Sequence, residues 1–91
     1  MRQAFLINCN VFQNAAIVRT LNAWENFDWL QVWPGMIVVI GEATLASVSD
    51  ALHQANPKAT YLVSQIKLRA TTMGWMPPKV WDFIRQGTQQ T

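Results

Sequence analysis

The chain has 91 residues, of which 51% are hydrophobic and only 13% are charged, and its formal net charge is +2. This composition excludes an intrinsically disordered tail, because such segments combine low hydrophobicity with high net charge. No apolar run reaches the about 20 residues of a membrane-spanning helix, and the start lacks the long apolar region of a signal peptide, so we expect a soluble, cytoplasmic protein without a membrane partner.

The first element in chain order is a predicted strand over Gln3–Asn10. Phe5 lies on one face of this strand and Leu6 on the other, and apolar residues on both faces indicate an interior strand. The segment Ala15–Trp24 then carries apolar residues at three- and four-residue intervals, which predicts an amphipathic helix. Asn14 is a residue type that suits the N-cap of this helix.

Two further strands are predicted over Phe27–Trp33 and Met36–Glu42. The second of them is the most apolar run in the chain and is rich in β-branched residues, which favours a strand buried on both faces over a buried helix segment. Pro34 and Gly35 between the two strands suit a type II turn. Because this turn type matches the twist of a hairpin poorly, we expect a loose or bulged hairpin.

A second helix over Leu45–Ala55 and a fourth strand over Thr60–Ile66 complete the predicted core. Thr44 suits the N-cap of the helix, and Asn56 followed by proline suits its end. The resulting order, strand-helix-strand-strand-helix-strand, is that of the ferredoxin-like α+β fold. This fold has an antiparallel sheet with two helices on one face and with the first and third strands in the centre.

Residues 67–91 are predicted to extend the 1–66 core within the same domain. Lys67–Met76 fits a further strand or an arm. A short helix is predicted to begin at Pro78, because proline is favoured in the first helical turn, and Gly87 fits its C-terminal stop. The apolar side of this helix consists of Val80, Trp81 and Ile84.

Residues that commonly carry catalysis are few and isolated. His53 has no neighbours at the spacing of a metal site, and it is read as a surface or partly packed helix residue. Cys9 is the single cysteine, so no internal disulfide is possible, and without a nearby base it is read as a small packed residue. No closely spaced pair of carboxylates suggests acid–base catalysis, and the sequence has no glycine-rich phosphate loop. We therefore expect no catalytic residue, no metal site and no cofactor.

The charge is distributed unevenly. Residues 1–50 hold two basic and four acidic residues, a net −2, while residues 51–91 hold five basic residues and one acidic residue, a net +4. A basic half attracts phosphates. Five positive charges without a cluster are nevertheless more typical of a solvated surface than of a nucleic-acid binder.

The chain has five tryptophans, namely Trp24, Trp29, Trp33, Trp75 and Trp81. Packing is the ordinary role of such rings. Trp29, Gln31 and Trp33 share one face of their predicted strand, and the predicted sheet has one face without helices. We expect these three residues to form an apolar patch there, covered by a second copy in a homodimer. Stacking of single-stranded bases on the rings is the alternative.

Five short segments resemble SinR-like proteins, relatives of the small CRISPR-associated ferredoxin-like subunit and of VapD-type ribonucleases. The segments are Phe5–Val11, Trp29–Val39, Ser49–Leu52, Tyr61–Ile66 and Gly74–Trp81. The resemblance implies a ferredoxin-like fold, a homodimer formed across the sheets and a C-terminal segment that reaches the partner subunit. It also implies a regulatory or defence-related role in a prokaryote or a phage, with an unidentified protein partner.

Nucleases of the wider family carry an aspartate at the end of the first strand, which holds a metal. The matching position here is Asn10, which is neutral and a poorer ligand for a hard divalent cation. The resemblance therefore favours a non-enzymatic interaction protein. The alternative is a nucleic-acid binder or weak metal-dependent ribonuclease, and a small-molecule-binding regulatory domain is suggested by fold analogy alone. The residues proposed to contact nucleic acid are Asn10, Lys67, Arg69, Lys79 and Arg85.

Overall fold

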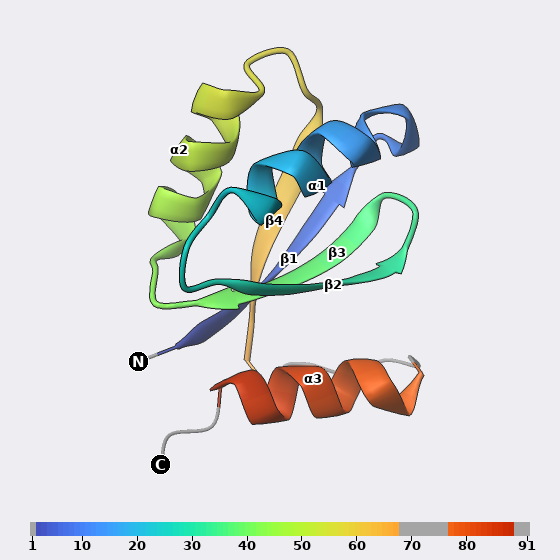
Figure 1. The fold of residues 1–91 in the computed structure, drawn as a ribbon, viewed down its shortest axis with the longest axis vertical. Coiled ribbons are helices and arrows are strands. Elements are labelled where there is room, and N and C mark those ends of the chain that lie inside the picture. Colours follow the sequence, from blue (N-terminus) through green and yellow to red (C-terminus); the bar gives the residue numbers. More distant parts are fainter. Residues whose placement is uncertain (1, 68–76, 89–91) are drawn as a thin grey trace.

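An antiparallel sheet of four strands separates three helices in the computed structural model, which describes residues 2–67 and 77–88 (Figure 1). The strands are β1 (Gln3–Cys9), β2 (Asp28–Trp33), β3 (Met36–Gly41) and β4 (Tyr61–Ile66). The helices are α1 (Asn14–Asn22), α2 (Leu45–Ala55) and α3 (Pro78–Thr88), and a short 3-10 turn, η1 (Val11–Gln13), joins β1 to α1. The chain therefore has an α+β architecture, as the sequence predicts.

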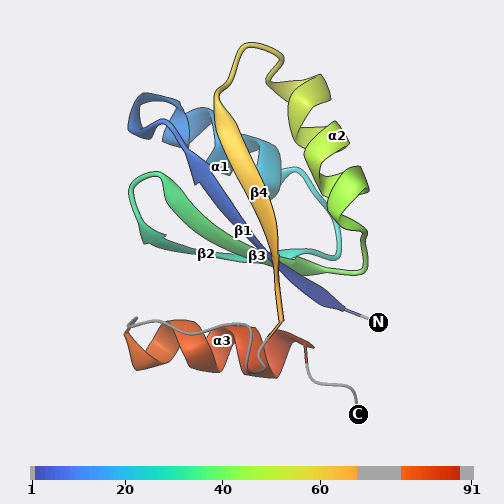
Figure 2. The same ribbon diagram turned by 180° about the vertical axis from the view of Figure 1, so that it is seen from behind.

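The strand order is β2-β3-β1-β4, and each strand is antiparallel to its neighbours. The two strands predicted to be interior, β1 and β3, occupy the centre, and β4 forms one edge (Figure 2). In β3 the four residues from Ile37 to Ile40 have no exposed surface. The apolar run at Met36 is therefore a doubly covered strand and not a helix segment.

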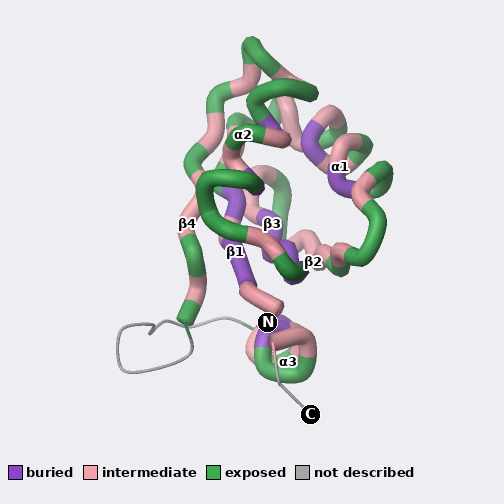
Figure 3. Tube along the Cα trace, turned by 90° about the vertical axis from the view of Figure 1, so that its left-hand side faces the viewer, coloured by how far each residue is buried: buried purple, intermediate pink, exposed green. Residues whose placement is uncertain are grey.

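One face of the sheet packs against α1 and α2 and forms the first core. Its buried residues are Phe5, Ile7, Ile17, Leu21, Ile37, Val39, Val48 and Leu52. The helical members of this core recur at the three- and four-residue spacing seen in the sequence. Figure 3 shows the buried segments in the central strands and on the helix faces that point toward them.

The opposite face of the sheet packs against α3 and forms the second core. Its buried residues are Ala4, Val38, Ile40, Val80 and Ile84. The expectation that this face lacks a helix is therefore wrong. The C-terminal helix is amphipathic, and Figure 1 shows that it lies across the strands on the side away from α1 and α2.

The end of α3 also differs from the prediction. Gly87 lies within the helix, which continues to Thr88, and does not stop it. A Cβ at this position would meet the side chain of Ile40, so glycine allows the helix to approach the sheet closely. The strand or arm predicted over Lys67–Met76 is untested, because residues 68–76 lie outside the described part of the chain.

Within residues 2–67 and 77–88, no helix combines the length and apolar character needed to cross a membrane.

The hairpin between β2 and β3 is bulged, as predicted. Gln31 pairs with Ile37, but the next pair joins Trp33 to Met36, so the register shifts by one residue.

Asn14 does not act as an N-cap. It is the first residue of α1, and its side-chain oxygen instead accepts a hydrogen bond from the N–H of Gly35 in the hairpin turn at 2.9 Å.

The start of α2 is capped reciprocally. The Oγ1 of Thr44 accepts a hydrogen bond from the N–H of Ser47 at 3.1 Å, and the Oγ of Ser47 accepts one from the N–H of Thr44 at 3.0 Å. These two bonds satisfy amide groups that have no partner within the helix. The predicted N-cap at Thr44 is therefore confirmed.

Replacing Thr44 by alanine is expected to lower the free energy of unfolding by about 1 kcal/mol, because the amide of Ser47 loses its acceptor. Urea denaturation followed by circular dichroism measures this loss. Thr60→Ala is the matched control, because Thr60 is exposed and lies outside the helices. Equal effects of the two substitutions would contradict a capping role for Thr44.

Candidate partner-binding surface

The predicted patch of Trp29, Gln31 and Trp33 is divided between the two faces of the sheet. Trp29 pairs with Val39 and packs against the first core, on the face covered by α1 and α2. Its indole N–H donates a hydrogen bond to the side-chain oxygen of Asn22 at 3.1 Å. Gln31 lies on the same face and is partly buried. The placement of these two residues on a helix-free face is therefore wrong.

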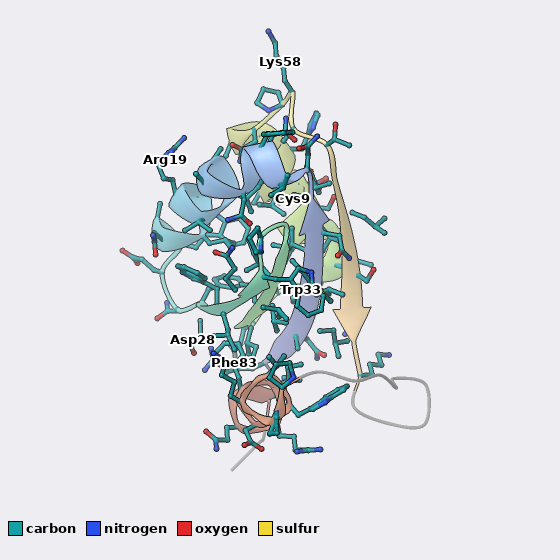
Figure 4. The ribbon with its side chains drawn as sticks, turned by 90° about the vertical axis from the view of Figure 1, so that its right-hand side faces the viewer. Cys9, Arg19, Asp28, Trp33, Lys58 and Phe83 are labelled. Carbon is teal, nitrogen blue, oxygen red and sulfur yellow. The ribbon has the colours of Figure 1, made fainter. Side chains whose placement is uncertain are left out.

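Trp33 lies on the other face because of the bulge. Strand alternation alone would put it on the face of Trp29, but the one-residue shift pairs it with Met36. Met36 alternates with Ile37 and so shares the face of Val38, which belongs to the second core. Trp33 is 50% exposed. Figure 4 shows the Trp33 side chain beside the sheet, with Phe83 on α3 below it.

The residues that pair with Trp33 across the sheet form a row at the end of β1. Met36 pairs with Asn8, and Asn8 pairs with Leu62 on β4. Leu62 is 64% exposed. The second core, which holds α3, lies over Val38 and the residues beyond it, so this row lies past the area that α3 buries.

Two more exposed apolar side chains follow β1 in the chain, on η1. Val11 is 52% exposed and Phe12 is 92% exposed. The turn is held beside the hairpin because the N–H of Cys9 donates a hydrogen bond to the carbonyl of Gly35 at 2.8 Å, and Figure 1 shows η1 beside the β2–β3 turn. We name this region the β1-end surface. It consists of Asn8, Val11, Phe12, Trp33, Met36 and Leu62, none of which is charged.

Asn10 holds the part of this surface that η1 presents. Its side-chain oxygen accepts a hydrogen bond from the N–H of Phe12 at 2.9 Å, and its own N–H donates to the carbonyl of Thr60 at 3.2 Å. The asparagine therefore caps the turn. In the described part of the chain, no group of three or more histidine, cysteine or acidic side chains is arranged to hold a metal ion.

Cys9 and His53 lie where the sequence suggests. Cys9 is partly buried and packs against the first core, and this burial raises the pKa of its thiol above the ordinary value. A raised pKa lowers the thiolate fraction and hence the reactivity at neutral pH. His53 is exposed in the last turn of α2.

The residues proposed to contact nucleic acid do not gather on one face. Lys67 follows β4 at the amino end of β1, because Ile66 pairs with Ala4, whereas Asn10 lies past the other end of a strand about 20 Å long. Lys79 and Arg85 are exposed on α3, and the guanidinium of Arg85 lies 3.5 Å from the carboxylate of Asp82. Arg69 lies outside the described residues. Nucleic-acid binding stays a prediction that this dispersed arrangement does not strengthen.

Sequence reasoning missed Val11, Phe12 and Leu62. Val11 and Phe12 follow a predicted strand, and nothing in their spacing shows that the turn leaves them exposed. Leu62 gave a weak signal, because it shares its strand face with the polar Ser64. An apolar residue on a half-polar face of an edge strand is a candidate for a contact outside the chain.

Comparisons of the chain with protein-family models, with curated proteins and with solved structures found no match.

Proposed function

We propose that this chain is a non-enzymatic interaction protein with a ferredoxin-like fold, which forms a homodimer through the β1-end surface. The order β2-β3-β1-β4 and the antiparallel pairing support this choice of fold. The observation that carries the dimer is the exposure of Phe12, Trp33 and Leu62, three large uncharged side chains around the end of β1. Contiguous apolar patches on a protein surface commonly mark an interaction site.

A second copy suits this surface for an electrostatic reason. In a two-fold contact each residue can face its own counterpart or a near neighbour, so a charged patch would meet like charge. The β1-end surface has no charged member and so avoids this repulsion. Trp33 and Phe12 are large, stiff side chains of the type that anchors interfaces.

The hydrogen bond between Asn10 and Phe12 supports the non-enzymatic part of the proposal. At the position where the nucleases of the proposed SinR-related family carry a metal-binding aspartate, this chain has a neutral side chain that caps η1. The amide thus helps to present Phe12. A regulatory or defence-related role in a prokaryote or a phage, with a further protein partner, follows from that proposed relationship.

We expect the wild-type chain to be dimeric at micromolar concentration and Leu62→Glu to raise the dimer dissociation constant at least about tenfold. The reason is that dimerisation would bury a charge without a partner. Sedimentation equilibrium measures this constant. Leu45→Glu is the matched control, because Leu45 is a leucine that is 39% exposed in the first turn of α2, away from the β1-end surface.

A wild-type chain that stays monomeric throughout the micromolar range would refute the homodimer. An equal effect of both glutamate substitutions would place the interface elsewhere. The nucleic-acid alternative predicts a different result, namely binding of labelled single-stranded RNA that weakens steeply as salt is raised.

A further inference from the structure

The two edges of the sheet differ in how they are protected against pairing with another chain. β2 forms one edge, and it carries the exposed Asp28 and the bulge after Gln31. Charged side chains and bulges are features that keep an edge strand from pairing further. β4 forms the other edge, and its six residues include no charged residue and no proline. Because it also pairs with β1 in one unbroken register, β4 is the regular and uncharged edge of this sheet.

The hydrogen bonds show which backbone groups of β4 face away from the sheet. In an antiparallel ladder the N–H and carbonyl groups of successive residues point alternately to the two sides of the strand. The N–H of Cys9 donates to Gly35, which precedes β3, so Cys9 is bonded on the β3 side. The N–H of Asn10 donates to Thr60, so the next residue is bonded on the β4 side. By this alternation the β4 residues whose backbone groups face outward are Tyr61, Val63 and Gln65.

The helices cover the faces of the sheet and not this edge. Among residues 2–67 and 77–88, no strand pairs with the outer side of β4. α2 packs on one face, where the hydroxyl of Tyr61 donates a hydrogen bond to the carbonyl of Ser49 at 2.9 Å. α3 packs mainly on β1, β2 and β3, on the other face. The edge lies between them, and Figure 3 shows β4 at the outside of the sheet.

The exposure of Leu62 is a second observation that concerns this edge. Leu62 lies on β4 and is largely exposed, although α3 covers the neighbouring part of the same face. A strand added beside β4 would bring a side chain to within about 5 Å of Leu62, measured between Cβ atoms. The side chain and the backbone of β4 therefore both indicate a strand from outside the chain.

We propose that β4 pairs with β4 of a second copy, antiparallel and in a register centred on Val63. This register pairs Val63 with Val63 of the partner subunit and Tyr61 with Gln65 of the partner subunit. All outward-facing N–H and carbonyl groups of both strands then have partners. The two Leu62 side chains lie diagonally across the two-fold axis, within reach of one another. A second copy suits the edge because two uncharged strands bring no like charges together.

This contact goes beyond the proposed dimer. Leu62 is the one member of the β1-end surface that lies on β4, and Trp33 lies on β2 at the opposite edge. A single pair of short strands buries less area than a stable interface needs, so we expect a dissociation constant of about 0.1–0.2 mM. At micromolar concentration the β1-end dimer therefore forms alone, and at higher concentration such dimers link through β4 into larger assemblies.

The test is amide hydrogen exchange of the ¹⁵N-labelled wild-type chain at about 20 μM and about 1 mM, followed by NMR. At the lower concentration we expect fast exchange at the three outward-facing residues and slow exchange at the residues bonded to β1, namely Leu62, Ser64 and Ile66. At the higher concentration exchange at Tyr61, Val63 and Gln65 should slow at least about threefold, because their amides exchange only from unpaired β4.

Substitutions at Gln65 identify the backbone bond. Gln65→Pro removes the outward N–H, and an edge strand tolerates proline where its N–H faces solvent. It should abolish the concentration dependence at Tyr61 and Val63 while Leu62 and Ser64 stay protected, which also shows that the sheet is intact. Gln65→Thr is the matched control, because it keeps the N–H but likewise removes the side-chain hydrogen bond to Gln3. It should behave as the wild type does.

Phe12→Glu separates this contact from the proposed dimer. It places a charge on the β1-end surface but leaves the edge of β4 unchanged, so the alternating pattern should persist in this variant even where the β1-end dimer is lost. Exchange at Tyr61, Val63 and Gln65 that is equal at the two concentrations, whether fast or slow, would overturn the pairing of β4. Unchanged concentration dependence in Gln65→Pro would overturn it as well.

Discussion

Gly35→Ala is expected to lower the free energy of unfolding by about 2–4 kcal/mol. Gly35 has a φ of +88°, which side chains other than glycine rarely adopt. A Cβ at this position would lie 2.8 Å from the carbonyl oxygen of Cys9, and a backbone atom in the central strand cannot move aside cheaply. Urea denaturation followed by circular dichroism gives the change.

The hydrogen bonds of Gly35 add to this sensitivity. Its carbonyl accepts a hydrogen bond from the N–H of Cys9 at 2.8 Å, and its N–H donates to the side chain of Asn14 at 2.9 Å. Any shift of the turn that relieves the new contact stretches both bonds. The turn ties β1, α1 and the hairpin together, so its distortion is expected to disturb the β1-end surface as well.

Two neighbouring variants separate the causes. Pro34→Ala should cost less than about 1 kcal/mol, because Pro34 is exposed and the main change is a looser unfolded chain. Gly35→Asn should cost nearly as much as Gly35→Ala, because asparagine tolerates positive φ but still carries the Cβ that meets Cys9. If Gly35→Asn is close to wild type, the backbone angle and not the contact is the cause.

Local patterns in the sequence were sufficient to predict most of the elements. The helix over Leu45–Ala55 has the predicted bounds, because Thr44 caps its start and Asn56 precedes a proline that cannot continue it. The run at Met36 is a central strand, because β-branched residues on both faces suit a strand covered on both sides. These features depend on short stretches of chain, and for that reason they can be predicted from the sequence.

The sequence did not predict which face of the sheet each strand residue would occupy. Alternation shows that Trp29 and Trp33 have the same parity, but it does not say which face is covered by α1 and α2. The bulge after Gln31 then reverses the parity of Trp33. The position of that extra residue depends on how the turn at Gly35 docks onto β1, which is a long-range contact.

The position of α3 is a second long-range feature. Its apolar stripe predicts an amphipathic helix, but any exposed apolar face could receive it. Val80 and Ile84 pack on Ala4, Val38 and Ile40. The sequence analysis had assigned this face of the sheet to a contact with a second copy of the chain. The candidate surface is therefore the region at the end of β1, which lies beyond the residues that α3 buries.

The division into two cores leads to the prediction about α3. The first core contains no residue of α3, so the sheet with α1 and α2 keeps its main apolar cluster when α3 is displaced. Ile84→Asp places a carboxylate where the side chain is 1% exposed, and we expect it to undock the helix. Amide protection in α3 should fall at least about a hundredfold, while protection in β1 and β3 falls much less.

Gln86→Asp is the control for this substitution, because Gln86 is exposed in the same helix and gains the same charge. Native-state hydrogen exchange measures both variants and resolves α3 from the strands. If Ile84→Asp lowers protection equally in α3 and in the strands, the two cores unfold as one unit and the division is wrong.

If only α3 opens, Val38 and Ile40 become exposed and the apolar area on that side of the sheet grows. Because the β1-end surface lies on the same face, the undocked variant should then self-associate more strongly than the wild type, and sedimentation equilibrium would show it.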